Sequence, residues 1–67
     1  MRIRIEKFPQ LRALCWNRPD DTVLYGADAL ALYERNWRFV DETVLAKDER
    51  ARLNKLIAEY GNGVMNV

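Results

Sequence analysis

The sequence predicts a mainly α fold: a compact three-helix small domain with short terminal β-strands. Two observations support this class. The chain has 67 residues, of which 49% are hydrophobic and 31% are charged, and this is the composition of one globular domain. Apolar residues recur in three stretches at the three- and four-residue spacing of helices, whereas the first seven residues alternate between apolar and charged. We therefore expect a single globular domain over residues 1–67.

Short strands are expected at one or both ends of the chain. Residues Met1–Lys7 alternate with the apolar side chains on one side, which is the pattern of a half-buried strand. At the other end, residues 64–67 follow a turn signal, Asn62-Gly63. We expect this tail to pair with Ile3–Ile5. A two-stranded ribbon is stable only when it packs on other elements, so it would lie against the helices.

The first helix is expected to begin at Pro9, because proline suits the first turn of a helix. Three apolar residues follow at helical spacing: Leu11, Leu14 and Cys15. Pro19 disfavours helical angles at the residue before it, so the helix should end near Asn17, with a turn over residues 18–21. Cys15 lies in an apolar run and is expected to be a small buried hydrophobe rather than a reactive thiol.

The second helix, expected to run continuously from about Gly26 to Val40, has two apolar sides. One stripe comprises Leu30, Tyr33, Trp37 and Val40. The other, nearly opposite, comprises Tyr25, Leu32 and Phe39. A surface helix of a small domain normally has one apolar stripe. Either this helix runs through the middle of the fold, or its second face contacts a partner. Tyr33 and Trp37 are interpreted as core residues.

The third helix is expected from about Ala46 to Tyr60, with Gly61 at its C′ position. It has a single apolar stripe, formed by Ala46, Leu53, Leu56, Ile57 and Tyr60. Its other side carries charged residues, among which Asp48 and Arg52 have the spacing of an i,i+4 ion pair. That side is typical of a solvated helix face.

The second and third helices share a start signal, since Thr-Val-Leu at residues 22–24 and again at 43–45 precedes each of them. Asp28 and Glu49 then fall at the third helical position, where a carboxylate meets free backbone amides. The N-cap positions are occupied by residues whose side chains cannot cap: Tyr25 and Ala46. A start at the threonine of either triplet would instead supply a capping side chain.

The composition offers little material for catalysis or metal binding. The chain has no His and one Cys, so acid–base or nucleophilic chemistry would need a shifted carboxylate, Lys, Tyr or thiol. The adjacent acids Asp20-Asp21 and Asp41-Glu42 fall at expected turns or helix ends, where carboxylates cap or are solvated. The three glycines are not clustered as a phosphate-binding loop. We expect no enzymatic activity, no cofactor, no metal and no small-molecule substrate.

The patterning also bears on location and partners. No apolar run approaches the roughly 18 residues of a membrane span, and the first residues lack the apolar core of a signal peptide. A single unpaired Cys fits a reducing compartment. We therefore expect a cytoplasmic protein without a membrane partner. The net charge is +1, with acidic residues interleaved among the basic ones, so charge alone favours no partner.

The second stripe predicts the contact surface. It groups Leu32, Arg35, Asn36 and Phe39 on one side of the second helix, with Tyr25 and Arg38 at its margin. An exposed Phe beside Leu, Arg and Asn resembles interface composition more than ordinary surface. We therefore expect a small protein-interaction or accessory module, regulatory rather than catalytic, that binds another protein or itself as a homodimer.

The alternative is a nucleic-acid-binding regulator. Two helices joined through Asp41–Leu45 loosely resemble a helix-turn-helix, although that motif usually has a three- or four-residue turn, often with Gly. The third helix would be the basic element, presenting Lys47, Arg50, Arg52 and Lys55. Acidic residues interrupt this series, whereas binding driven by counterion release needs several unopposed cations. Nucleic acid is therefore the less favoured partner.

Overall fold

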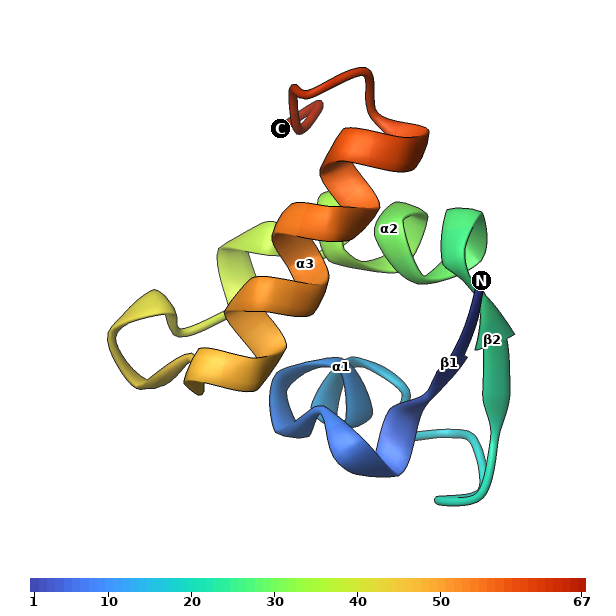
Figure 1. Cartoon of the computed structure of the whole chain (residues 1–67). Helices are drawn as coiled ribbons and strands as arrows, with labels where there is room; N and C mark the ends of the chain where they lie inside the picture. The colour runs from blue at the N-terminus through green and yellow to red at the C-terminus, as the bar shows by residue number, and fades with distance from the viewer.

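The computed structural model describes all of residues 1–67 and has the predicted fold class, three α-helices with a short antiparallel ribbon (Figure 1). The helices are α1 (Pro9–Leu14), α2 (Gly26–Arg35) and α3 (Lys47–Tyr60), and the strands are β1 (Arg2–Arg4) and β2 (Val23–Tyr25). The segments between these elements contain three short 3₁₀ helices: η1 (Ile5–Lys7), η2 (Trp37–Phe39) and η3 (Glu42–Val44). In Figure 1, α3 lies across α2, α1 lies below both, and the ribbon closes the right-hand side.

The ribbon joins β1 to β2, with Ile3 opposite Leu24. The prediction that the tail at residues 64–67 would form this partner strand is wrong. The tail is irregular and is held by a hydrogen bond of 2.7 Å from the Asn66 backbone N–H to the Glu34 carboxylate. Residues 23–25 pair instead because they lead directly into α2, which places their extended backbone beside β1.

The first strand is also shorter than predicted. The extended conformation ends at Arg4, and the chain then tightens into η1, in which Phe8 N–H donates to the Ile5 carbonyl at 3.0 Å. Ile3 and Ile5 are nonetheless both buried, as the alternation predicted. The apolar side of the segment therefore reaches the core through a strand followed by a turn.

One cluster of buried apolar side chains lies between the ribbon and the three helices. Its members are Ile3, Ile5, Phe8, Leu11, Cys15, Leu24, Ala29, Leu30, Tyr33, Val40, Leu53 and Leu56. Burial of Cys15 and Tyr33 confirms two of the predictions made from helical spacing. Trp37 packs against this cluster but is only partly buried, so its assignment to the core is confirmed in part.

The first helix begins at Pro9 as predicted but ends at Leu14, three residues before the expected Asn17. Cys15 is its C-cap, and the Cys15 carbonyl accepts the Arg18 N–H at 2.9 Å, which turns the chain early. The predicted turn over residues 18–21 is present, closed by a 3.1 Å bond from Thr22 N–H to the Pro19 carbonyl.

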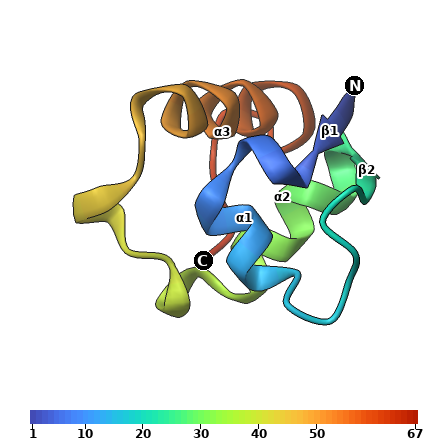
Figure 2. The same cartoon turned by 90° about the horizontal axis from the view of Figure 1, so that it is seen from below.

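A continuous second helix over residues 26–40 is the main prediction that is wrong. The α-helix ends at Arg35, and Asn36 has φ −117° and ψ 20°. The backbone N–H of Asn36 donates to the Leu32 carbonyl at 3.1 Å, and its side-chain amide donates to the same oxygen at 3.0 Å. A short amide side chain that competes for a backbone carbonyl in this way favours a helix end. The chain continues as η2 and then in a wide arc toward α3 (Figure 2).

The third helix follows its prediction closely. Ala46 is the N-cap and Tyr60 the last helical residue. Gly61, however, is the C-cap with φ −111°, and the left-handed conformation expected of a C′ residue falls on Asn62, with φ 55°. The expected ion pair between Asp48 and Arg52 does not form. The Arg52 guanidinium lies instead 5.9 Å from the centroid of the Phe8 ring.

The carboxylate of Glu49 is buried at the centre of the fold, where it accepts three hydrogen bonds. Two come from the backbone N–H groups of Gln10 and Leu11, each at 2.9 Å, and the third from the Tyr33 hydroxyl. The predicted position of Glu49 in the first turn of α3 is confirmed. Its carboxylate nevertheless satisfies amides at the start of α1 rather than those of its own helix.

Candidate protein-interaction surface

Two buried side chains that could carry chemistry, Tyr33 and Cys15, have raised pKa values. Tyr33 is held as the neutral phenol, because burial and then its hydrogen bond to Glu49 raise its pKa. Burial also raises the pKa of the Cys15 thiol, with a smaller opposing effect from the charge of Arg18. A catalytic cysteine needs the opposite shift. His, Cys, Asp and Glu side chains nowhere gather in a group of three that could hold a metal ion.

A hollow of about 350 Å³ with a mainly hydrophobic lining lies between the end of α1 and η2. It is lined by Ala13, Leu14, Trp16, Asn36 and Phe39, and we call it the aromatic groove. Trp16 is 84% exposed and Phe39 is 67% exposed. Large aromatic rings bury roughly 150–250 Å² each when they are covered, so two open rings across one hollow are unusual for a small domain.

Trp16 is placed by the way α1 ends. Cys15 turns into the core, and its N–H donates to the carbonyls of both Leu11 and Arg12, which tightens the last turn. The next residue, Trp16, is carried outward because consecutive positions at a helix end point about 100° apart. Burial of Cys15 and exposure of Trp16 therefore have the same local cause.

Phe39 is placed by the break at Asn36. Two bonds form η2, from Phe39 N–H to the Asn36 carbonyl at 2.8 Å and from Val40 N–H to the Trp37 carbonyl at 3.0 Å. Val40 is buried in the core and Trp37 is partly buried, so Phe39 between them is turned out to solvent. The ring is thus held on a short, hydrogen-bonded turn.

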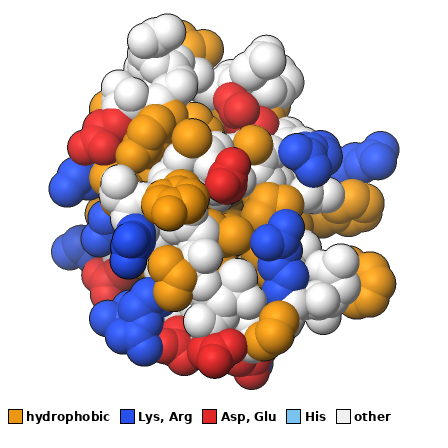
Figure 3. Space-filling model, turned by 90° about the vertical axis from the view of Figure 1, so that its right-hand side faces the viewer, with side chains coloured by type: hydrophobic (Ala, Val, Ile, Leu, Met, Phe, Trp, Pro, Cys, Tyr) orange, Lys and Arg blue, Asp and Glu red, His pale blue; other side chains and the backbone are white.

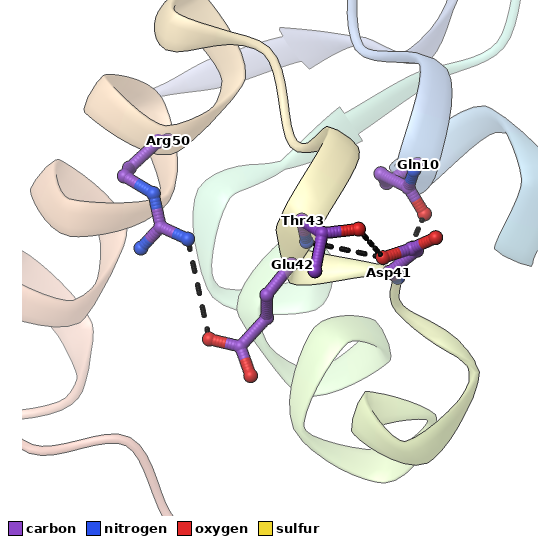
Figure 4. A network of polar contacts seen from close by, with 5 residues as sticks. All are labelled: Gln10, Asp41, Glu42, Thr43 and Arg50. Atoms are coloured by element: carbon purple, nitrogen blue, oxygen red, sulfur yellow. Dashed lines mark hydrogen bonds and ion pairs between the residues drawn. The ribbon is translucent and has the colours of Figure 1, made fainter.

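The chain beyond Phe39 is fastened to two helices, as Figure 4 shows. The Asp41 N–H donates to the Gln10 side-chain oxygen at 3.3 Å, which ties this segment to α1. The Asp41 carboxylate accepts the Thr43 N–H at 3.0 Å and the Thr43 hydroxyl at 2.6 Å, and these bonds lower the pKa of Asp41. Glu42 lies 4.0 Å from Arg50 of α3. The segment that follows Phe39 is therefore anchored to both α1 and α3.

Five of the six predicted contact residues line three different hollows, and the sixth, Arg38, lies beside the Phe39 ring. Asn36 and Phe39 line the aromatic groove, and the Arg38 guanidinium lies 5.1 Å from the centroid of the Phe39 ring. Leu32 and Arg35 line a neighbouring hollow of about 160 Å³. Tyr25, 64% exposed, lines a third hollow at the opposite end of α2, on the side that carries the ribbon. On that side, hydrophobic side chains are interspersed with charges of both signs (Figure 3).

Sequence reasoning missed Trp16, Leu14 and Ala13 as surface residues of this groove. One signal was present, because Trp16 lies beside Cys15 and off the stripe formed by Leu11 and Cys15. Nothing in the sequence indicates that the end of α1 meets η2, since the two segments are distant along the chain.

The basic positions of α3 are arranged differently from those of a helix-turn-helix. The connection from α2 to α3 covers residues 36–46 and contains η2 and η3, so it is longer than the predicted turn at Asp41–Leu45. Arg50 lies near Glu42, and Arg52 lies over Phe8. A hollow of about 390 Å³ joins Arg52 and Lys55 with the acidic Asp48. The cations of α3 are thus partly opposed by acids.

The chain matches no protein-family model, no curated protein and no solved structure. None of the helices has both the length and the apolar character that crossing a bilayer requires. The function is therefore inferred from the surface itself.

Proposed function

We propose that this protein is a non-catalytic protein-interaction module and that the aromatic groove is its contact surface. The observation that carries this proposal is the pair of exposed rings, Trp16 and Phe39, that line one hollow together with Leu14. Trp and Arg dominate the binding energy of protein interfaces, and such residues cluster in pockets at the interface centre.

The apolar area of the two rings is large enough to anchor a protein partner. A partner that covers both rings would bury on the order of 300 Å² of apolar surface, worth roughly 7 kcal/mol. Association costs about 4–15 kcal/mol in lost freedom, so the rings supply anchors but further contacts are required. Both rings lie on hydrogen-bonded turns next to buried residues, Cys15 and Val40, so little freedom of the backbone is lost on binding.

The proposed contact surface differs from the one predicted from the sequence. Asn36 and Phe39 remain in it with Arg38 beside them, while Leu14 of α1 and Trp16 just after that helix take the place of Tyr25. Leu32 and Arg35 border the groove through the neighbouring hollow. The chain would act by holding a segment of another protein rather than by converting a substrate.

The test is a selection of random displayed peptides on the full chain, followed by NMR mapping of the enriched peptides. We expect amide shift changes at residues 13–16 and 36–39, and loss of binding in Trp16→Ala and Phe39→Asp. Tyr25→Ala is the matched control, since this aromatic side chain has a similar exposure outside the groove. Enrichment of no peptide, or shifts confined to another surface, would overturn the proposal.

A further inference from the structure

The two segments that line the aromatic groove are rich in arginine and free of acidic residues. The two segments that supply its lining, residues 12–18 and 35–39, contain four arginines and no acidic residue: Arg12, Arg18, Arg35 and Arg38. The rest of the chain carries seven Lys or Arg and ten Asp or Glu. A net charge of +1 therefore combines two basic segments beside the groove residues with an acidic remainder of the chain.

Three of these arginines have no acidic partner in the fold. Arg12 lies 3.3 Å from Asp20, in a pair whose side chains are both more than half exposed. Arg18 and Arg35 line the hollow beside the groove together with Asp28, but neither forms an ion pair with it. Arg38 lies over the Phe39 ring and also forms no ion pair.

The acids nearest to the groove along the chain are already engaged. Glu34 accepts the Asn66 N–H at 2.7 Å, and the Asp41 carboxylate accepts both donors of Thr43. The guanidinium groups of Arg18, Arg35 and Arg38 are thus left for groups outside the chain. A guanidinium fork binds a carboxylate through two parallel hydrogen bonds.

We infer that the partner presents a short acidic segment with a large apolar side chain. The apolar side chain fills the aromatic groove, and flanking carboxylates pair with Arg18, Arg35 and Arg38. This inference rests on the proposed function and adds the chemistry of the partner to it.

Two other occupants fit less well. In a two-fold dimer the same surface of both copies meets, so the arginines of one copy would lie near those of the other. Single-stranded nucleic acid binds through bases stacked on open aromatic faces. Here the groove also has the aliphatic lining of Ala13 and Leu14, which suits an apolar side chain better than a base.

The experiment compares four labelled probes with the full chain by fluorescence anisotropy. The first is a peptide of about twelve residues with Phe and Leu among Asp and Glu, and the second has Lys in place of every acid. The third keeps the acids but has Ser in place of Phe and Leu, and the fourth is oligothymidylate of similar length. We expect tight binding of the first probe alone, weakened by added salt.

The double variant Arg35→Gln/Arg38→Gln should weaken binding of the acidic apolar peptide about five- to tenfold, because exposed ion pairs contribute modestly. Arg2→Gln is the matched control, since Arg2 is exposed, forms no ion pair and lines a different hollow. Equal binding of the lysine peptide, or no effect of the double variant, would overturn the inference.

The outcomes separate this inference from the proposed function. Library peptides that bind the groove in a Trp16-dependent way, yet lack acids and ignore the arginine variants, would refute the acidic partner alone. Oligothymidylate that binds the groove and displaces the selected peptides would refute both. Concentration-dependent dimers that are lost in Trp16→Ala would refute the acidic segment in favour of a second copy.

Discussion

The Tyr33 hydroxyl of α2 donates a 2.6 Å hydrogen bond to the Glu49 carboxylate of α3 in the interior of the fold. The same carboxylate accepts the first free amides of α1. That helix needs an external acceptor for the N–H groups of Gln10 and Leu11, because its N-cap residue, Phe8, has no polar side chain. One carboxylate thus completes the start of α1 and joins the three helices, and no buried side-chain polar atom is left without a partner.

Glu49→Gln should therefore be strongly destabilising. The amide group offers one acceptor oxygen where the carboxylate has two, so an NH₂ would face a backbone N–H of α1. We expect a loss of about 2–4 kcal/mol in the free energy of unfolding, measured by urea denaturation. Glu59→Gln, at an exposed position of the same helix, should change it by less than about 0.5 kcal/mol. A similarly small change for both variants would contradict the capping role.

Tyr33→Phe removes one donor to the carboxylate and keeps the ring. The expected cost is about 1–3 kcal/mol, since Glu49 retains its two backbone donors. In the double variant with Glu49→Gln, the loss should be smaller than the sum of the single losses, because each variant removes the same bond. Strict additivity in this double-mutant cycle would show that the two side chains act independently.

Stability should fall at alkaline pH. Burial raises the pKa of Cys15 above its ordinary value of 9.0, and burial with the Glu49 hydrogen bond raises that of Tyr33 above 10.0. The folded state therefore keeps both groups neutral, while the unfolded chain releases their protons. This stabilisation is complete below about pH 9 and is lost as the pH rises through and beyond that value.

The measurement is the urea midpoint as a function of pH between about 7 and 10.5. Cys15→Ala and Tyr33→Phe should each flatten the decline, because each removes one of the titrating groups. A midpoint that stays level or rises over this range would contradict the assignment. The thiol should also resist alkylation in the folded protein and react readily in urea.

The exposed groove residues should contribute little to stability. Trp16→Ala, Phe39→Asp and Arg35→Glu should each change the free energy of unfolding by less than about 0.5 kcal/mol while abolishing or weakening partner binding. Leu11→Ala, in the core, should lower the free energy of unfolding by about 2–5 kcal/mol, and thermal unfolding of all four variants would show the contrast. A large loss in Phe39→Asp would show that the ring packs inside the fold.

The parts of the fold that were predicted correctly are those with a local cause. The start and end of α3 follow from its apolar period and from the glycine-containing turn after Tyr60, and α2 starts where the Tyr25 N-cap was expected. Cys15 and Tyr33 were placed in the core from spacing alone. Each of these depends on residues within a few positions of one another.

The incorrect predictions concern contacts between distant segments or one competing side chain. The early end of α2 depends on the Asn36 amide, a bond that a hydrophobic period does not register. Pairing of β1 with Val23–Tyr25 rather than with the tail involves only three residues per strand, too few to show a period. The groove likewise combines Phe39, which was predicted as a contact residue, with Trp16, which was not.

The sequence by itself determined the class of fold, the limits of α3, the start of α2 and most of the core, because helical periodicity separates buried from exposed positions locally. Only the tertiary structure decided that Glu49 completes α1 and that Trp16 and Phe39 line the same hollow. These relationships join segments 23 to 39 residues apart along the chain. They arise because every packing contact in the core must be satisfied at once, which no single stretch of residues can specify.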